Sequence, residues 1–340
     1  MRVYYHLSAY ISHRLSGLEY ISCLRNAGYT VFCLPEELPL ADTAIIHDDP
    51  LNYPVIFARL PRLRDLRSIA FCVWENEVLP EEYVIPLRLV QEIWTPSTFS
   101  QKSLLTRFSA VHVVPHVVRR VKISSEDRDF ARKAVAKKNE KFTFFSIVDS
   151  ANPRKNITGL LTAFSALYAL TPEKPLLVLK QYRVSMDCSG IPGVISLDGD
   201  LSPGQMAALH TLCDAYVSAH HAEGWGLGIS EAMSYGKPAI ATAYSGNMDY
   251  MDAGNSMPVP CSMAPVSLEM RERIPLFTAD MLWAQPDPTA LVLTMKQALH
   301  GRLPAGLRER AADIARRFGP EQVAAVMREL LGGSCQAGLA

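Results

Sequence analysis

Short apolar runs alternate with helix-like stretches along nearly the whole chain. In residues 1–120 the runs that read as strands are RVYYHL, YTVFCLP, AIIHDDP, SIAFCVW, VQEIWTP and VHVVPHVV. A helix is expected over 17–27, ending near Gly28. Strands that alternate with helices are typical of α/β folds with parallel sheets. The pattern therefore predicts a first α/β domain over residues 1–120.

The stretch from Arg119 to Lys141 differs in character, because it is rich in arginine and lysine and carries few large apolar side chains. We expect a linker over 121–140 that includes an exposed helix. A solvated protein surface accounts for such charges. The alternative interpretation is contact with an anionic membrane surface or with acceptor phosphates.

A second alternating set of apolar runs follows the linker. Its expected strands are KFTFFSIVD, PLLVLK, GVISLDG, DAYVSA and KPAIATA, and its expected helices are 156–170, PGQMAALHTLC, GISEAMSYG, 288–299 and 309–331. The set predicts a second α/β domain over 141–318, while a C-terminal helix near 320–340 could pack back on the first domain. Two Rossmann-like lobes in series imply a cleft between the domains, with a ligand at the carboxyl ends of the strands.

Composition narrows the class of protein. The 340 residues suit two domains, and 34 basic against 34 acidic side chains leave no net charge that would attract nucleic acid. The seven cysteines are scattered without metal-ligand spacing, which favours a reducing compartment. The sequence shows neither a signal-peptide pattern nor an apolar run long enough to span a bilayer. We expect a cytoplasmic protein, with peripheral contact at the inner face of the membrane as an open alternative.

The most informative segment is DAYVSAHHAEGWGLGISEAMSYGKPAIATAYSGN. A strand is expected to end at Ala219 and a helix to begin at about Ile229. The loop between them contains three glycines, Gly224, Gly226 and Gly228. Glycines let backbone N–H groups approach an anion closely, and a helix N-terminus adds partial positive charge. This arrangement suits a diphosphate, although it matches neither the dinucleotide-binding fingerprint nor a P-loop.

Two carboxylates, Glu223 and Glu231, bracket this loop. A diphosphate repels a carboxylate, whereas hydroxyl groups such as those of a sugar donate hydrogen bonds to a carboxylate. Each acid also has a structural explanation, Glu223 as a helix cap and Glu231 as an acid in the first helical turn, where the helix dipole favours it. Considered together with the glycines and Trp225, the two acids favour a site for a diphosphate that carries a sugar.

The run Glu223-Gly-Trp-Gly-Leu, followed by Glu231-Ala-Met and Gly236-Lys-Pro, resembles the E-x7-E signature of family 4 glycosyltransferases. The resemblance implies a GT-B fold and a reaction that retains the anomeric configuration. It also implies that Glu223 contacts the donor sugar and that Glu231 contacts the nucleotide ribose. The loop backbone would approach the sugar and the diphosphate through Gly224, Trp225, Gly226 and Leu227.

A second segment, SIVDSANPRKNITGLLTAF, is similar to the phosphate-binding segment of that family. Relatives carry an arginine just after the strand and a lysine a few residues later, and these neutralise the diphosphate. By this resemblance Lys155 takes the lysine position, Ser150 stands where the arginine is usual, and Arg154 supplies the second charge. Basic residues at the start of a helix oppose the helix dipole, and a bound anion would resolve that conflict.

The first domain resembles the family more weakly. Its runs CVWENEVLPEEYVIPLRLVQEIWTPSTFSQKSLL and VHVVPHVV, together with SAHHAEGWGL and SGNMDYM, look like family 4 enzymes of polysaccharide assembly. This likeness implies a glycan or lipid-linked acceptor. The glycine-rich acceptor loop usual after the first strand is missing, and HLSAYISHRLSG stands in its place. Trp74 and Glu75 end a strand of this domain, either as acceptor-side groups or as a core tryptophan beside a surface acid.

Other polar residues leave two explanations open. The histidines His220 and His221 precede Glu223 and are either structural or in contact with the donor phosphate or sugar. The spacing of Asp198 and Asp200 around a glycine suits a tight turn as well as a metal site, and the two-lobe fold gives it no metal role. We expect no metal ion and no cofactor, with the nucleotide diphosphate sugar as co-substrate.

The expected reaction moves a glycosyl group from a nucleotide diphosphate sugar to an acceptor hydroxyl. Glu223, Lys155 and Arg154 form the expected catalytic group, in which the two cations stabilise the leaving diphosphate. The other expected donor contacts are Glu231, Ser150, His221 and the loop Gly224–Leu227. Two alternatives remain, namely a GT-B sugar-nucleotide epimerase or phosphorylase and a non-catalytic partner subunit.

Overall fold

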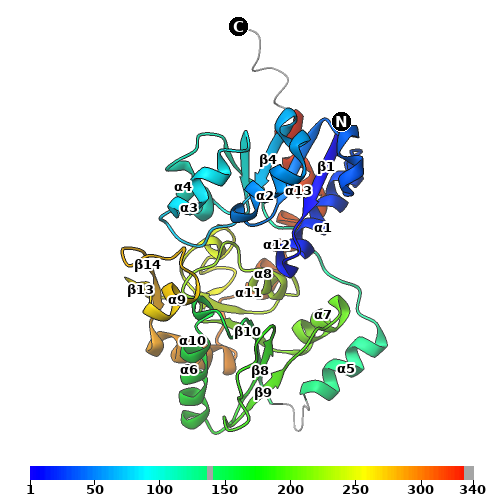
Figure 1. Cartoon of the computed structure of the whole chain (residues 1–340). Coiled ribbons are helices and arrows are strands. Elements are labelled where there is room, and N and C mark those ends of the chain that lie inside the picture. The colour runs from blue at the N-terminus through cyan, green and yellow to red at the C-terminus, as the bar shows by residue number, and fades with distance from the viewer. Residues whose placement is uncertain (136–140, 333–340) are drawn as a thin grey trace. The chain divides into compact units, whose positions relative to one another are not determined.

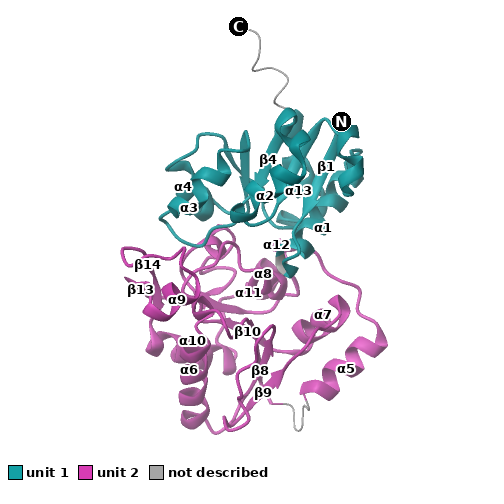
Figure 2. Cartoon of the chain, viewed as in Figure 1, with its two compact units in different colours: residues 1–117, 316–340 teal, residues 118–315 magenta. Residues whose placement is uncertain are grey.

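The computed structural model of the protein describes residues 1–135 and 141–332. The chain divides into two compact units (Figures 1 and 2). Unit 1 combines Met1–Val117 with the segment that begins at Arg316, and unit 2 is formed by Val118–Ala315. Each unit contains a six-stranded parallel sheet with flanking helices, which confirms the expected α/β class with two Rossmann-like lobes.

The sheet of unit 1 has the strand order β2-β1-β3-β4-β5-β6, and all neighbouring strands are parallel. Its strands are β1 (Arg2–Leu7), β2 (Thr30–Phe32), β3 (Thr43–His47), β4 (Arg67–Phe71), β5 (Glu92–Thr95) and β6 (Val111–Val113). Its helices are α1 (Ile11–Asn26), α2 (Tyr53–Arg59), α3 (Glu81–Leu87), α4 (Thr98–Leu105) and α13 (Pro320–Gly332). Every residue of β3 is buried, as expected for a strand covered on both faces.

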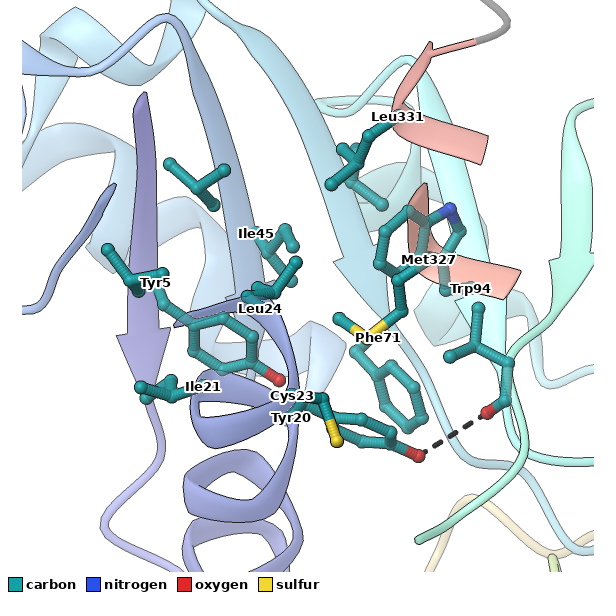
Figure 3. Packing of buried hydrophobic residues seen from close by; sticks show 14 of the residues in the cluster. Tyr5, Tyr20, Ile21, Cys23, Leu24, Ile45, Phe71, Trp94, Met327 and Leu331 are labelled. Atoms are coloured by element: carbon teal, nitrogen blue, oxygen red, sulfur yellow. Dashed lines mark hydrogen bonds between the residues drawn. The ribbon is translucent and has the colours of Figure 1, made fainter. Parts of the chain in front are cut away.

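The core of unit 1 joins both ends of the chain. Tyr20 of α1, Phe71 and Trp94 of the sheet, and Met327 and Leu331 of α13 belong to one buried cluster (Figure 3). The guanidinium of Arg67 also donates hydrogen bonds of 2.9 and 3.1 Å to the carbonyl oxygens of Leu330 and Leu331 in the last turn of α13. Helix α13 is therefore an integral part of the packing around the first sheet.

Two helix predictions were wrong in their bounds. Helix α1 begins at Ile11 rather than Gly17, so much of the stretch HLSAYISHRLSG is helical instead of a loop. No glycine or proline precedes Gly17 to prevent this earlier start. The helix expected over 309–331 is divided into α11 (Leu307–Ala312), α12 (Ile314–Arg317) and α13. Pro320 at the start of α13 explains the last break, because proline has no N–H to continue the preceding helix.

The sheet of unit 2 has the strand order β12-β11-β10-β7-β8-β9, again parallel throughout. Its strands are β7 (Thr143–Val148), β8 (Leu176–Gln181), β9 (Val194–Leu197), β10 (Ala215–Ser218), β11 (Ala239–Thr242) and β12 (Met257–Val259). Its longer helices are α5 (Ser125–Val135), α6 (Ile157–Leu170), α7 (Pro203–Leu212), α8 (Leu227–Ser234) and α10 (Pro288–Leu299). Short 3₁₀ turns include η4 (Pro153–Lys155) and η5 (Gly246–Asp249).

Strands β7 and β10 are direct neighbours at the centre of this sheet. Because they run parallel, the loops that follow them emerge at the same edge of the sheet. The first loop leads through η4 into α6, and the second leads through the glycines into α8. The topology thus brings together two segments that are distant in the sequence. Arg154 of the first and Glu223 of the second are 69 positions apart.

The basic stretch at the start of unit 2 is only partly exposed. Helix α5 packs against α7, where Asp127 accepts a hydrogen bond from Ser202, and its residues Ala131 and Val135 are buried. The expected exposed helix thus has one buried face. The remainder of the predicted linker, 136–140, lies outside the described residues. Among the described residues, no helix is both long and apolar enough to cross a membrane.

An antiparallel hairpin with an enclosed helix was not expected from the sequence. It consists of β13 (Cys261–Pro265), α9 (Leu268–Arg273) and β14 (Leu282–Pro286). We call residues 261–286 the hairpin insertion. Helix α9 packs against η4, and Arg273 donates a hydrogen bond of 3.0 Å to the carbonyl oxygen of Ala151. The insertion therefore contacts the loop that follows β7.

Candidate functional site

Two loops meet at the carboxyl edge of the unit 2 sheet and are held together by the backbone. Asn156 caps α6 by accepting a hydrogen bond from Gly159, and its side-chain amide donates one of 2.8 Å to the Ala219 carbonyl. The N–H of His221 donates a hydrogen bond of 2.8 Å to the Arg154 carbonyl. Asn156 has a left-handed φ of 51°, which asparagine tolerates better than most residues. These contacts fix the two loops relative to each other.

Glu223 lies between Arg154 and Lys155 in the buried edge of this junction. Its carboxylate is 2.6 Å from Lys155 Nζ and 3.1 Å from Arg154 Nη1. The Arg154 guanidinium also donates a hydrogen bond of 2.5 Å to the Ala222 carbonyl. Glu223 and Arg154 are each 7% exposed. The structure therefore brings together the three residues expected to be catalytic, and Arg154 is buried instead of being an exposed residue at the start of a helix.

Charge compensation keeps all three residues ionised. Burial alone would raise the pKa of Glu223, but Lys155 and Arg154 lower it to about 2. Burial would lower the pKa of Lys155, but Glu223 outweighs this and raises it. The neighbouring His220 is neutral, because burial lowers its pKa to about 4. Two cations and one carboxylate leave the cluster with one net positive charge, which favours an anion.

The glycine loop forms a tight turn directly before α8. Gly226 has a φ of +89° and caps the helix, which begins at Leu227. The Tyr250 hydroxyl lies 2.8 Å from the Trp225 carbonyl oxygen and 2.9 Å from that of Gly226. The Trp225 side chain is buried and donates a hydrogen bond to Ser230. Trp225 thus supports the turn with its side chain.

The backbone of the glycine loop is also held by Ser245 and Gly246, residues without a role predicted from the sequence. The Gly246 N–H donates a hydrogen bond of 2.9 Å to the Glu223 carbonyl, and Glu223 N–H donates one of 2.7 Å to Ser245 Oγ. A Cβ atom on Gly246 would lie 2.1 Å from the Gly224 carbonyl oxygen. The signal that could have revealed this support is the run SGNMDYM, which begins at Ser245.

Glu231 is not in the first turn of α8, which corrects the sequence interpretation. Because the helix begins at Leu227 rather than Ile229, Glu231 is its fifth residue, beyond the turn in which the helix dipole is strongest. Its side chain is 44% exposed, and Oε2 lies 3.4 Å from Nε2 of the buried His210. The structure places Glu231 on the helix that follows the glycine loop, in contact with His210.

The remaining expected contacts have partners within the protein. The Ser150 hydroxyl donates a hydrogen bond to the side-chain oxygen of Gln181. His220 bridges Ser218 and Asn247, as expected for a structural histidine. His221 stacks on Trp283 of the hairpin insertion. Ser150 and His221 therefore border the same junction, while His220 supports it from within.

The Asp198–Asp200 segment is a turn stabilised by a cation of the protein. Gly199 has a φ of +76°, which favours glycine. Lys180 donates a hydrogen bond of 2.6 Å to the Gly199 carbonyl, and Asp198 accepts one of 3.0 Å from Ser196. Across the described residues, no group of three or more His, Cys, Asp or Glu side chains is arranged to hold a metal ion.

A buried cluster with net positive charge thus lies beside a glycine turn at the carboxyl edge of a parallel sheet, the edge at which α/β proteins bind their ligands. Residues 127–257, which contain the whole cluster and Glu231, match the family model described as glycosyl transferases group 1. No curated protein sequence matches the chain. The family match covers less than half of the chain, and solved structures extend the comparison to nearly all of it.

Three solved structures illustrate the similarity. Sucrose-phosphate synthase from Thermosynechococcus elongatus is 14% identical with a TM-score of 0.68, covering 99% of this chain and 100% of its own. HepE of Anabaena, in complex with UDP-glucose, is 14% identical with a TM-score of 0.67, covering 98% and 100%. WaaG, a glycosyltransferase involved in lipopolysaccharide biosynthesis, is 11% identical with a TM-score of 0.65, covering 98% and 100%. The fold is therefore that of GT-B glycosyltransferases, and the family match over residues 127–257 supports glycosyl transfer.

Proposed function

We propose that the protein is a retaining family 4 glycosyltransferase, which moves a sugar from a nucleotide diphosphate sugar to an acceptor hydroxyl without a metal ion. The observation that carries the proposal is the buried cluster of Arg154, Lys155 and Glu223, with one net positive charge beside the glycine turn. The cluster offers charge for a diphosphate and a carboxylate for sugar hydroxyls within a single group of side chains.

The diphosphate would take the place of Glu223 as the partner of the two cations. Arg154, Lys155 and the N-terminus of α8 would bind its oxygens, and the backbone of Gly224–Leu227 would allow its close approach. Ser150 would contribute a hydroxyl donor at the edge. Once the cations bind phosphate, the Glu223 carboxylate can accept hydrogen bonds from the sugar. Glu231 would bind the hydroxyl groups of the ribose.

The reaction breaks the bond between the anomeric carbon and the oxygen of the leaving phosphate. A new bond forms between the anomeric carbon and the oxygen of the acceptor. The proton of the acceptor hydroxyl passes to the leaving phosphate oxygen on the same face of the sugar, so the configuration is retained without a separate base. Arg154 and Lys155 stabilise the negative charge that grows on the diphosphate in the transition state.

The acceptor side of the proposal rests on unit 1. The likeness of its sequence to enzymes of polysaccharide assembly supports a glycan or lipid-linked acceptor, and therefore a role in surface glycan assembly. A lipid-linked acceptor would require contact with the inner face of a membrane, which we include in the proposal. The start of α1 takes the place of the glycine-rich acceptor loop that is usual in the family.

The phosphate assignment is tested with Arg154→Met, Lys155→Met and the double variant. We expect each single variant to release nucleoside diphosphate from its sugar nucleotide at least about tenfold more slowly, since ~1.4 kcal/mol of barrier stabilisation is lost. Arg132→Ala, which removes an exposed arginine from α5 of the same unit, is the matched control and should retain the rate. Unchanged rates in both single variants and the double variant would refute the assignment.

A further inference from the structure

The hairpin insertion holds His221 by both its backbone and its ring. The His221 carbonyl accepts a hydrogen bond of 3.0 Å from the Ala284 N–H, and His221 Nδ1 lies 2.6 Å from the Ala284 carbonyl oxygen. The imidazole stacks on the indole of Trp283, with 4.0 Å between ring centroids and 15° between the ring planes. On the other side, the His221 N–H is bonded to the Arg154 carbonyl. The ring is therefore fixed in position and in orientation.

These contacts determine which nitrogen of His221 carries the proton. A carbonyl oxygen can only accept, so Nδ1 is the protonated nitrogen. Burial and, to a smaller extent, the nearby charge of Arg154 lower the pKa of His221 below its ordinary value, although the hydrogen bond to Ala284 acts in the opposite direction. The ring is therefore neutral at neutral pH. The other nitrogen, Nε2, consequently presents a lone pair.

The Nε2 atom of His221 is available to a ligand. None of the described residues forms a hydrogen bond to it, and it is not among the buried polar atoms that lack a partner, so it reaches solvent. His221 stands two positions before Glu223 in the sequence, and its backbone N–H is bonded to the Arg154 carbonyl. The available lone pair therefore belongs to a residue whose backbone is bonded directly to that of Arg154 in the cationic cluster.

The lone pair on Nε2 decides whether His221 binds a phosphate oxygen or a sugar hydroxyl group. Phosphate oxygens are acceptors, so they repel a neutral Nε2, whereas a hydroxyl group can donate to it. We propose that His221 Nε2 accepts a hydrogen bond from a hydroxyl group of the donor sugar, and that Trp283 is the residue that positions the imidazole for this contact. This inference rests on the proposed function and adds a sugar-recognising residue to it.

The hairpin insertion supports this role from a second side. Arg273 on α9 is bonded to the Ala151 carbonyl, and α9 packs against η4, which carries Arg154 and Lys155. The same insertion thus contacts the phosphate-side loop through α9 and the sugar-side histidine through β14. Its contribution is to set the distance between the cations and the hydroxyl acceptor.

The test compares the affinity for a sugar nucleotide with that for the corresponding nucleoside diphosphate. Calorimetric titrations of the full chain use UDP, GDP, ADP and dTDP and their sugar conjugates UDP-glucose, GDP-mannose, ADP-glucose and dTDP-glucose. For the pair that the wild type binds, His221→Asn keeps a donor near Ala284 but removes the acceptor at Nε2. We expect it to bind the sugar nucleotide about three- to tenfold more weakly, as for one lost neutral hydrogen bond, with the diphosphate alone bound as before.

Two further substitutions at the same position separate a hydroxyl contact from a phosphate contact. His221→Gln places a carbonyl oxygen near the Nε2 position and should recover part of the sugar-nucleotide affinity. His221→Arg replaces the lone pair by a cation, so it should weaken sugar-nucleotide binding relative to the diphosphate. Wild-type affinity of His221→Asn for the sugar nucleotide, or equal weakening of both ligands by this variant, would overturn the proposal.

The positioning role is tested at Trp283. Trp283→Ala removes the stacking surface and should show the same selective loss as His221→Asn, while Trp283→Phe keeps an aromatic face and should retain most of the selectivity. Melting temperatures show that each variant is folded, and a folded Trp283→Ala variant with wild-type selectivity would overturn the role of Trp283. Absence of binding of all eight probes to the wild type would refute the proposed function itself, a result distinct from loss of the His221 effect.

Discussion

At the scale of single residues, the site depends on a carboxylate that is held between two cations. Glu223 has a strongly lowered pKa because Lys155 and Arg154 oppose the effect of its burial. A buried ion pair is costly to form, and removing one partner leaves a buried charge uncompensated. A charged ligand could therefore replace Glu223 as the partner of the two cations. The ionisation of Glu223 also makes the stability of the fold depend on pH.

The pH dependence of stability provides a test of this ionisation. The pKa of Glu223 is lowered from 4.5 to about 2 in the folded protein. A lowered folded pKa stabilises the fold above pH 4.5, and this contribution is lost as the pH falls from about 4.5 towards 2. Glu223→Gln removes the titration, so its free energy of unfolding should fall less than that of the wild type, by an amount on the order of 2–3 kcal/mol.

Urea unfolding at pH 7, 5, 4 and 3 measures the difference between the two proteins. Other acids with lowered pKa values, such as Asp42 and Asp48, titrate in both proteins, so their effects cancel in the difference. Parallel stability curves for the wild type and Glu223→Gln would contradict the ionised, paired state of Glu223.

The proposed role of Glu231 leads to a second prediction for a single residue. If its carboxylate binds the ribose, Glu231→Ala should weaken binding of the cognate nucleoside diphosphate roughly tenfold or more, as for a charged hydrogen bond. The same variant should no longer distinguish a ribonucleotide from its 2′-deoxy analogue. Isothermal titration measures both effects. Binding of every candidate nucleotide at wild-type strength would exclude the ribose role.

At the scale of secondary-structure elements, the site is made by loops that approach each other at the backbone. The Glu223–Gly224 backbone and η5 are close enough that no side chain fits at Gly246. Gly246→Ala should therefore displace the loop, lower the free energy of unfolding by about 1–3 kcal/mol as in other overpacked sites, and weaken nucleotide binding. Gly190→Ala is the matched control in the same unit, because a Cβ atom there meets nothing within 4 Å. Equal behaviour of the two variants would show that the close approach is unimportant.

The elements also show what the sequence could and could not predict. The apolar runs and glycines correctly predicted parallel strands followed by helices, because buried strands and glycine turns leave a local signal. The pairing of Glu223 with Lys155 could not be read locally, since it depends on β7 and β10 being neighbours. The hairpin insertion also escaped prediction, because β13 and β14 each end in a proline and are connected through α9 instead of a tight turn.

At the scale of the whole molecule, unit 1 is completed by residues from the far end of the chain. Met327 is fully packed in the cluster that contains Tyr20 and Trp94. Met327→Ala should lower the free energy of unfolding by about 2–5 kcal/mol, whereas the volume-conserving Met327→Leu should cost less than about 1.5 kcal/mol. Arg328→Ala, at the adjacent exposed position, controls for helix effects. Calorimetric unfolding in which Met327→Ala matches the wild type would contradict the packing of α13 in this core.

The central claim is that the cationic cluster of unit 2 binds the diphosphate of a sugar nucleotide. The most direct measurement is the ratio of affinities for a nucleoside diphosphate and the matching nucleoside monophosphate, determined by calorimetry for the wild type and for Lys155→Met. The account predicts that the wild type binds the diphosphate at least about tenfold more tightly, as for one charge-assisted hydrogen bond, and that Lys155→Met loses most of this preference. Equal affinity of the wild type for both ligands, or an unchanged ratio in Lys155→Met, would contradict it.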